Sequence, residues 1–395
     1  MRKTTKKIFR KTMLAIAIAN CSVMNLSAQG NTMGMGNENE QIQSLSERIL
    51  KLEKKSDAIN VYLNLKSSYE ERFNGDDKGG SFVGNQLRFE MQGNLNEHWS
   101  YRLRYRLNRP GEQQSDNFSN NIDIMMAQYK FNDRWSVAGG KLGVAFGGYQ
   151  YDDNPINVLE FCDFLCGIDG FHVGAHVSYT ANKNNTFTLG VYNVNNNNSK
   201  KYYSEAPDLK QAKHPLGASV HWAGNLFDGK LQTLWSYSLG QEASNSYTNF
   251  VMLGTKLNLK KWQFIIDYYG GWEQLDHNKT VSADMSAALG QTVLARNTSY
   301  NTVLGEIHYQ PTPHWNCMLV GGIESASANN VSDFHNYRKS YCYQAAVQWI
   351  PDLTQNARLS LAYIGKKVDY TSRCGLEDYN RDRVELSLIY RIKAY

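Results

Sequence analysis

From residue 58 to the end of the chain, apolar and polar side chains alternate with a period of two. The stretch WSYRLRYRLN at 99–108 shows this most clearly. Its odd positions are Trp, Tyr and Leu, whereas three of its even positions are Arg102, Arg104 and Arg106. Successive side chains of a β-strand point to opposite faces. Each such run therefore predicts a strand with one apolar face and one polar face.

Sixteen runs of this kind are present, at 59–71, 82–94, 99–108, 121–131, 135–146, 170–180, 186–194, 215–223, 230–240, 247–259, 261–273, 299–310, 314–325, 338–350, 357–369 and 383–394. Seven of the connections are short turns and eight are mostly longer loops, which places both chain ends on the short-turn side. This regularity is typical of outer-membrane barrels. An open sheet edge in hydrocarbon would leave backbone groups without partners. We therefore predict an all-β fold: a transmembrane up-and-down antiparallel β-barrel of about 16 strands over residues 58–395.

Composition and the placement of tryptophan agree with a barrel. The mean hydropathy is −0.54 and no stretch approaches ~20 apolar residues, which excludes a helical membrane protein. Most tryptophans adjoin short turns, as in an aromatic girdle at one membrane interface: Trp99, Trp135, Trp222, Trp262, Trp315 and Trp349. The alternative is a soluble β-sandwich or propeller. No blade repeat of ~40 residues is evident, and a soluble sheet has no reason to concentrate tryptophan beside one class of turn.

The N-terminal residues predict export. A basic stretch and an apolar stretch precede a small-residue site, so we expect residues 1–28 to be a signal peptide cleaved after Ala28. Lipoprotein processing at Cys21 is the alternative, although Asn20 is unfavourable before such a cysteine. Removing residues 1–28 takes away six basic and no acidic residues, so the formal charge falls from +5 to −1. The basic pI of the whole chain is therefore no sign of a nucleic-acid partner.

A short apolar repeat follows in the predicted mature chain. Ile42, Leu45, Ile49 and Leu52 are spaced by three or four residues. Residues 29–57 are thus expected to be a periplasmic N-terminal segment with a short helical coiled coil, or else a single amphipathic helix.

The polar faces of the strands predict a water-filled lumen, since 16–18 strands enclose an aqueous channel. Three consecutive inward positions of 99–108 are arginines, and Arg88 of the preceding run has inward parity. We expect Arg88, Arg102, Arg104 and Arg106 to form a basic rail that attracts anions. The alternative is that these arginines only balance nearby carboxylates in a hydrated wall.

The third long loop, residues 147–170, has the composition of a constriction element. Its apolar residues favour burial inside the lumen rather than exposure to water. It contains Asp152, Asp153, Glu160, Asp163 and Asp169 but no Lys or Arg. Opposite a basic wall, such a loop would produce a transverse field.

No motif indicates an enzyme. The chain contains no GxSxG or comparable nucleophile motif, and its cysteine spacings fit no zinc pattern, so we predict no catalytic residue, metal or cofactor. Cys162 and Cys166 form a local bridge or remain free thiols, and Cys317, Cys342 and Cys374 complete the predicted mature set. An outer-membrane hydrolase and a structural or adhesive barrel are the rival functions.

Together these features resemble the phosphate-selective porin family (the O and P porins) of Gram-negative outer membranes. The residues that carry the resemblance are the predicted signal peptide, the coiled-coil-like segment, the glycine-rich VAGGKLGVAFGG at 137–148, the arginine rail and the final strand ending in Tyr395. The resemblance implies a homotrimer with an inward third loop and an arginine ladder, matched here by Arg102, Arg104 and Arg106. In the family, lysines at the constriction select phosphate, and Lys141 is the nearest candidate here.

The expected function is that of an outer-membrane porin, a passive diffusion channel for small hydrophilic solutes that favours anions such as phosphate. A general, weakly selective porin is the alternative. The expected partners are outer-membrane lipid and lipopolysaccharide, permeating solutes and inorganic anions, and two further copies of the chain.

Overall fold

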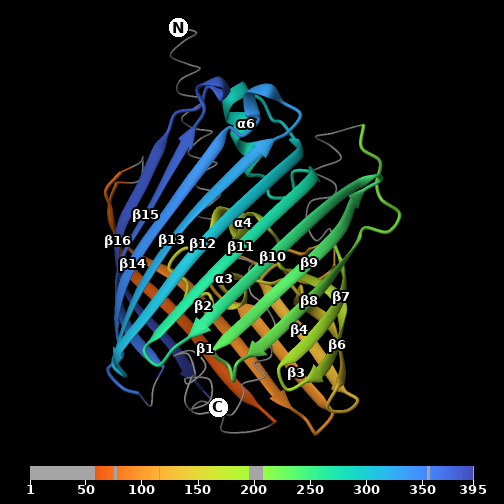
Figure 1. Cartoon of the computed structure of the whole chain (residues 1–395), viewed down its shortest axis with the longest axis vertical. Coiled ribbons are helices and arrows are strands. Elements are labelled where there is room, and N and C mark those ends of the chain that lie inside the picture. The colour runs from red at the N-terminus through yellow and green to blue at the C-terminus, as the bar shows by residue number, and fades with distance from the viewer. Residues whose placement is uncertain (1–57, 75–77, 115, 195–207, 354–355, 395) are drawn as a thin grey trace.

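The computed structural model describes residues 58–74, 78–114, 116–194, 208–353 and 356–394. The predicted signal peptide at 1–28 and the predicted coiled-coil segment at 29–57 lie outside these ranges. Within them, sixteen strands form one closed barrel, in which each strand pairs with its neighbours in sequence (Figure 1). The barrel is closed by antiparallel pairing of the first and last strands, with Tyr62 opposite Lys393.

The strand bounds agree closely with the alternating runs of the sequence. The strands are β1 (Asn60–Arg72), β2 (Gly79–Asn94), β3 (Trp99–Arg106), β4 (Ile122–Lys130), β5 (Trp135–Gly143), β6 (Phe171–Asn182), β7 (Asn185–Asn193), β8 (Leu216–Leu226), β9 (Leu231–Ala243), β10 (Ser246–Asn258), β11 (Trp262–Leu275), β12 (Arg296–Thr312), β13 (Trp315–Ala328), β14 (Arg338–Trp349), β15 (Ala357–Tyr370) and β16 (Tyr379–Lys393). The prediction of a 16-stranded up-and-down barrel is confirmed.

Side-chain exposure follows the predicted alternation. On β16, Leu386 is 53% exposed and Leu388 43%, whereas Glu385 and Ser387 between and beside them are 0% and 1% exposed. The exposed face of the barrel is therefore apolar and the inner face is polar along this strand, as contact with lipid on one side requires.

Aromatic pairs mark the short-turn end of the barrel. Trp315 lies opposite Trp349 across β13 and β14, and Trp262 stacks on Tyr309 with ring centroids 4.2 Å apart. The tryptophans at this end form a girdle of rings whose polar edges suit the membrane–water interface.

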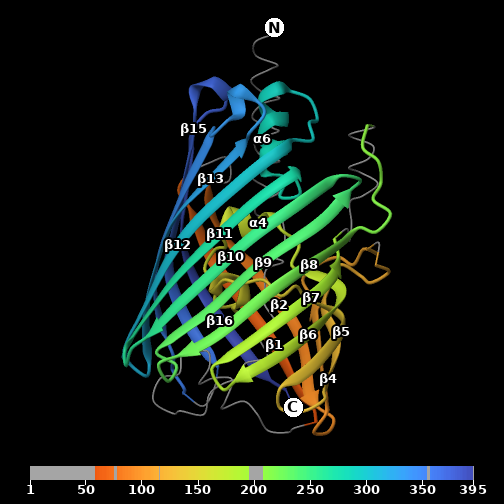
Figure 2. The ribbon, with the colours of Figure 1, turned by 45° about the vertical axis from the view of Figure 1, so that its right-hand side comes forward.

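In the described part of the chain the helices are short and lie within loops. They are α3 (Tyr149–Asp152), α4 (Asp163–Gly167), α6 (Thr280–Leu289), η1 (Ser332–Phe334) and η2 (Ser372–Cys374). Among the described residues, none of the helices is long and apolar enough to cross a membrane. Figure 2 shows α4 behind the strands, at mid-height of the barrel, and α6 at the end where the long loops lie.

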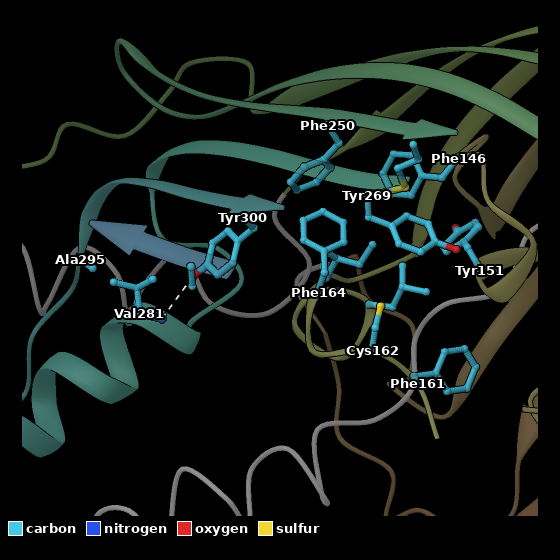
Figure 3. Packing of buried hydrophobic residues seen from close by; sticks show 14 of the residues in the cluster. Phe146, Tyr151, Phe161, Cys162, Phe164, Phe250, Tyr269, Val281, Ala295 and Tyr300 are labelled. Atoms are coloured by element: carbon cyan, nitrogen blue, oxygen red, sulfur yellow. Dashed lines mark hydrogen bonds between the residues drawn. The ribbon is translucent and has the colours of Figure 1, made fainter. Parts of the chain in front are cut away.

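Part of the lumen is filled by the loop between β5 and β6, whose apolar residues are buried against the wall. Loop residues such as Phe161, Phe164 and Leu165 form one buried cluster with wall residues such as Phe250 and Tyr269 (Figure 3). Inner positions of β10–β12 such as Phe250, Tyr269 and Leu304 are apolar, and where they pack in this cluster the loop and the wall exclude water together.

Replacing Val303 by arginine tests the outward face. Val303 lies in the middle of β12 and is 53% exposed. Val303→Arg should lower the free energy of unfolding in lipid vesicles by about 2–4 kcal/mol, the cost of arginine near the bilayer midplane. Val303→Leu is the control and should leave it nearly unchanged. Equal stability of the two variants would contradict a lipid-facing position.

Candidate functional site

The loop between β5 and β6 enters the barrel through two glycines. The amide of Gly147 donates to Ser236 Oγ at 2.7 Å, and that of Gly148 donates to the carbonyl of Leu234 at 3.0 Å. A Cβ added to Gly147 would lie 2.4 Å from the carbonyl oxygens of Leu234 and Met252. Gly148 has φ +92°, a conformation that favours glycine. The end of the 137–148 motif therefore allows the loop backbone to lie directly on the inner wall.

Two carboxylates of the wall bind the starts of the two loop helices. Asp267 of β11 accepts the amides of Tyr149 and Gln150 of α3, each at 2.8 Å. Glu324 of β13 accepts the amides of Asp163 and Phe164 of α4, at 2.9 and 3.2 Å. These amides have no partner within their helices, so each carboxylate both satisfies them and fixes one end of the loop. No sequence motif marks Asp267 or Glu324 as a partner of the loop.

Asp163, one of the predicted loop acids, contacts the wall on the side of β14 and β15. Its carboxylate accepts Arg338 Nη2 at 2.7 Å and Ser340 Oγ at 3.2 Å, and it pairs with Lys366. Asp163, Arg338 and Lys366 are all buried. The ion pairs of Asp163 with Arg338 and Lys366 therefore attach the loop to the wall.

Glu160 is attached in the same way to β16. Its two carboxylate oxygens bind Arg381 and Arg383, which share the inward face because they are two residues apart. Burial opposes ionisation of Glu160, but the two guanidiniums hold the pKa of its carboxyl well below the ordinary value. The spacing of Arg381 and Arg383 was visible in the sequence, but their partner was not.

Of the remaining loop acids, Asp169 lies after α4 and accepts a hydrogen bond from the amide of Phe171 at 3.2 Å, whereas Asp152 and Asp153 lie beside α3. Asp152 is its last residue. Asp153 Oδ1 accepts the side chain of Asn157 and the amide of Asn154, both at 2.7 Å, and burial raises the pKa of Asp153. Asn157 in turn accepts a hydrogen bond from Arg358 of β15.

Three of the four predicted rail arginines converge on one carboxylate. Arg106 Nε, Arg104 Nε and Arg88 Nε lie 2.6, 3.1 and 3.5 Å from Asp123 of β4. Arg88, Arg104 and Arg106 are 5% exposed or less. The structure thus places these arginines together inside the barrel, around a shared counter-ion.

Asp123 reaches this position through a β-bulge. Arg104 pairs with Ile124 whereas Tyr105 pairs with Ile122, so Asp123 is the extra residue and is buried next to buried Ile124. An inward position of Asp123 could not be predicted from strict alternation, which places Asp123 on the same face as exposed Met125. A carboxylate at a position expected to face lipid is unfavourable, and this conflict could have indicated the bulge.

The fourth arginine belongs to a second group that extends to the loop. Arg102 Nη2 and Arg391 Nη1 bind Glu90 at 2.7 and 2.8 Å. Asn64 Oδ1 accepts hydrogen bonds from Arg391 at 2.7 Å and from Asn154 of the loop at 3.1 Å. Arg102 retains 18% side-chain exposure, more than the other three arginines.

The two groups bring five guanidiniums to one wall of the barrel. Those of Arg88, Arg102, Arg104, Arg106 and Arg391 contact the carboxylates of Asp123 and Glu90. Among the described residues, Arg88 Nη1 and Arg104 Nη2 are buried and make no hydrogen bond.

The other candidates have structural partners. Lys141 is buried and lies 3.1 Å from Asp116 of the loop between β3 and β4. The cysteines at 162, 166, 317, 342 and 374 are free thiols, so the alternative of a Cys162–Cys166 bridge is not observed. No group of three or more His, Cys, Asp or Glu in the described ranges could hold a metal ion.

A closed sixteen-strand barrel with an apolar outer face and a loop folded onto its inner wall defines the class of outer-membrane porins. The chain belongs to the family described as phosphate-selective porins O and P, which matches residues 59–392. The protein is therefore an outer-membrane channel.

Solved porin structures share the fold at low sequence identity. The outer-membrane channel DcaP of Acinetobacter baumannii superposes with a TM-score of 0.58 at 10% identity, covering 86% of this chain and 99% of that one. The anion-selective porin of Comamonas acidovorans gives 0.56 at 8% identity, covering 85% and 99%. The trimer form of OmpT of Vibrio cholerae gives 0.53 at 10%, covering 85% and 99%. Curated protein sequences include no significant match.

Replacing the shared counter-ion tests the arginine cluster. Asp123→Asn should lower the free energy of unfolding by about 3–5 kcal/mol, because it removes the carboxylate that three buried guanidiniums share. Asp133→Asn, in the exposed turn after β4, is the control and should have little effect. If Asp123→Asn unfolds like the wild type in denaturant titrations, the guanidiniums do not depend on Asp123.

Adding a methyl group at Gly147 tests the seating of the loop. Gly147→Ala should cost about 1–3 kcal/mol of local stability through the clash with two carbonyls. Amide hydrogen exchange in α3 should then accelerate roughly 5- to 150-fold. Gly321→Ala is the matched control, since nothing lies within 4 Å of its Cβ position. Unchanged exchange in Gly147→Ala would show that the loop does not depend on this close approach.

Proposed function

We propose that the channel passes small hydrophilic solutes by passive diffusion and favours inorganic anions such as phosphate. The observation that carries the proposal is the gathering of five guanidiniums, those of Arg88, Arg102, Arg104, Arg106 and Arg391, on one wall of the barrel. Fixed cationic groups that line one side of a channel attract anions and raise their local concentration. The family description and the anion-selective porin of similar fold support the same preference.

The burial of the rail supports a second candidate, a general porin with weak selectivity. Arg88, Arg104 and Arg106 are almost fully buried around Asp123, which reduces their access to a passing ion. In this alternative, Arg102 alone contributes to the lumen surface and the other three arginines stabilise the wall. The loop acids Asp152, Asp153, Glu160 and Asp163 then shape the constriction rather than select ions.

We further propose that the protein is a homotrimer in contact with outer-membrane lipid and lipopolysaccharide. The trimer form of OmpT supports the assembly, and the apolar outer face supports the lipid contact. The family and fold are those of channels and support the absence of an enzymatic activity.

Reversal potentials in a KCl gradient across a planar bilayer distinguish the two candidates. The wild type should reverse near the chloride equilibrium potential. Arg102→Gln should lower the chloride-to-potassium permeability ratio roughly two- to fivefold, which corresponds to ~0.5–1 kcal/mol of lost attraction in water. Replacing Arg102, Arg104 and Arg106 together by alanine should lower it further.

Arg134→Gln, in the exposed turn before β5, is the control and should reverse as the wild type does. A cation-selective wild type would overturn the anion preference. An unchanged triple variant would assign the arginines to the stability of the wall and favour the general porin.

A further inference from the structure

The extracellular loop from residue 276 to 295 is held against the barrel by hydrogen bonds and buried side chains, as the constriction loop is. Asp276 accepts the amide of Ser282 at 2.6 Å and the hydroxyl of Tyr300. The same Tyr300 hydroxyl accepts a hydrogen bond from the amide of Val281 at 3.2 Å, which Figure 3 shows as a dashed line. Val281 and Met285 are buried. Helix α6 is thus bound to the barrel and not free on its surface.

One side chain of this loop contacts α4 directly. Asn278 Nδ2 donates to the carbonyl of Phe164 at 3.0 Å, and Asn278 is buried. A Cβ on Gly167, the last residue of α4, would lie 2.3 Å from the Asn278 side chain. The absence of a side chain at Gly167 therefore makes room for Asn278.

One arginine of the wall binds both elements. Arg338 reaches Asp163 of α4 at 2.7 Å, and its Nε lies 3.4 Å from Asp284 of α6. Asp284 also accepts the hydroxyls of Tyr337 and Tyr370, at 2.7 and 3.1 Å. The position of the guanidinium thus depends on carboxylates of both helices.

Apolar contacts join the same two helices. Phe164 of α4 and Tyr300 of β12 have ring centroids 6.3 Å apart, and both belong to the buried cluster that contains Val281 and Met285. The cluster therefore extends without interruption from the extracellular helix to the constriction loop.

From these contacts we infer that α6 holds the constriction helix α4 in place through two positioning residues, Asn278 and Arg338. The two helices form one cooperative unit, so loosening α6 increases the mobility of α4 even though Glu324 still binds its first amides. The conductance of the channel thus depends on an extracellular element. This dependence holds whichever ions the channel prefers.

Single-channel recordings in planar bilayers test the inference with two near-isosteric variants. Asn278→Asp sets a carboxylate oxygen against the Phe164 carbonyl, and Asp284→Asn removes the charge that Arg338 binds. Each variant should show additional conductance levels and more open-channel current noise. The temperature of barrel unfolding should remain near that of the wild type, because the closed strand ladder is unaffected. Asp333→Asn, an exposed acid of η1, is the control.

Traces of both variants that match those of Asp333→Asn would overturn the inference. Hydrogen exchange of the wild-type protein is a second test that needs no variant. The amides of 163–167 and 281–289 should open together with one free energy, as members of one unit do. Exchange of the two segments with clearly different opening free energies would show that α6 and α4 are independent.

Discussion

Every backbone amide and carbonyl within the hydrocarbon of a membrane needs a partner inside the protein, and the pairing of β1 with β16 completes that set. The rest of the architecture depends on this closure. Once the sheet is closed, each strand has one face toward lipid and one toward the lumen, so sequence alternation becomes a strict requirement. A lumen sixteen strands wide is too large for wall side chains alone to fill. The loop after β5 occupies part of it and narrows the remainder.

The strands could be predicted from the sequence because the signal is local. Each run of period two specifies its own faces, and the runs that became β3 and β16 needed no knowledge of their neighbours. Asp123 shows where this reasoning stops, because one extra residue in β4 reverses the parity of the strand beyond it. The partners of the loop were beyond prediction for a different reason. Asp163 binds Arg338 and Lys366, which are 175 and 203 residues away in the chain. Only the closed register of the barrel brings them together.

The basic wall holds several arginines against buried carboxylates inside the barrel. Three guanidiniums share the carboxylate of Asp123, so each arginine of this group has a counter-ion nearby. Burial of such a group is costly unless its members are held in place, and the shared carboxylate supplies that restraint. The basic rail and local charge balance therefore remain two hypotheses for the same cluster. Burial limits how closely an ion approaches Arg88, Arg104 and Arg106, whereas Arg102 is more exposed.

Buried carboxylates also attach the constriction loop to the wall. Two wall carboxylates, Asp267 and Glu324, bind the starts of its helices, while its own acids, Glu160 and Asp163, bind cations of β14–β16. The loop is thus attached both by carboxylates of the wall that bind its amides and by its own carboxylates that bind cations of the wall. A loop anchored only by ion pairs would remain exposed to water and to screening by salt. The apolar cluster that joins Phe164 to Tyr300 and α6 removes this weakness, since it excludes water from one side of the loop. Because α4 and α6 share this cluster, the constriction does not move independently of the extracellular loop. Helix α6 therefore contributes to the structure of the constriction.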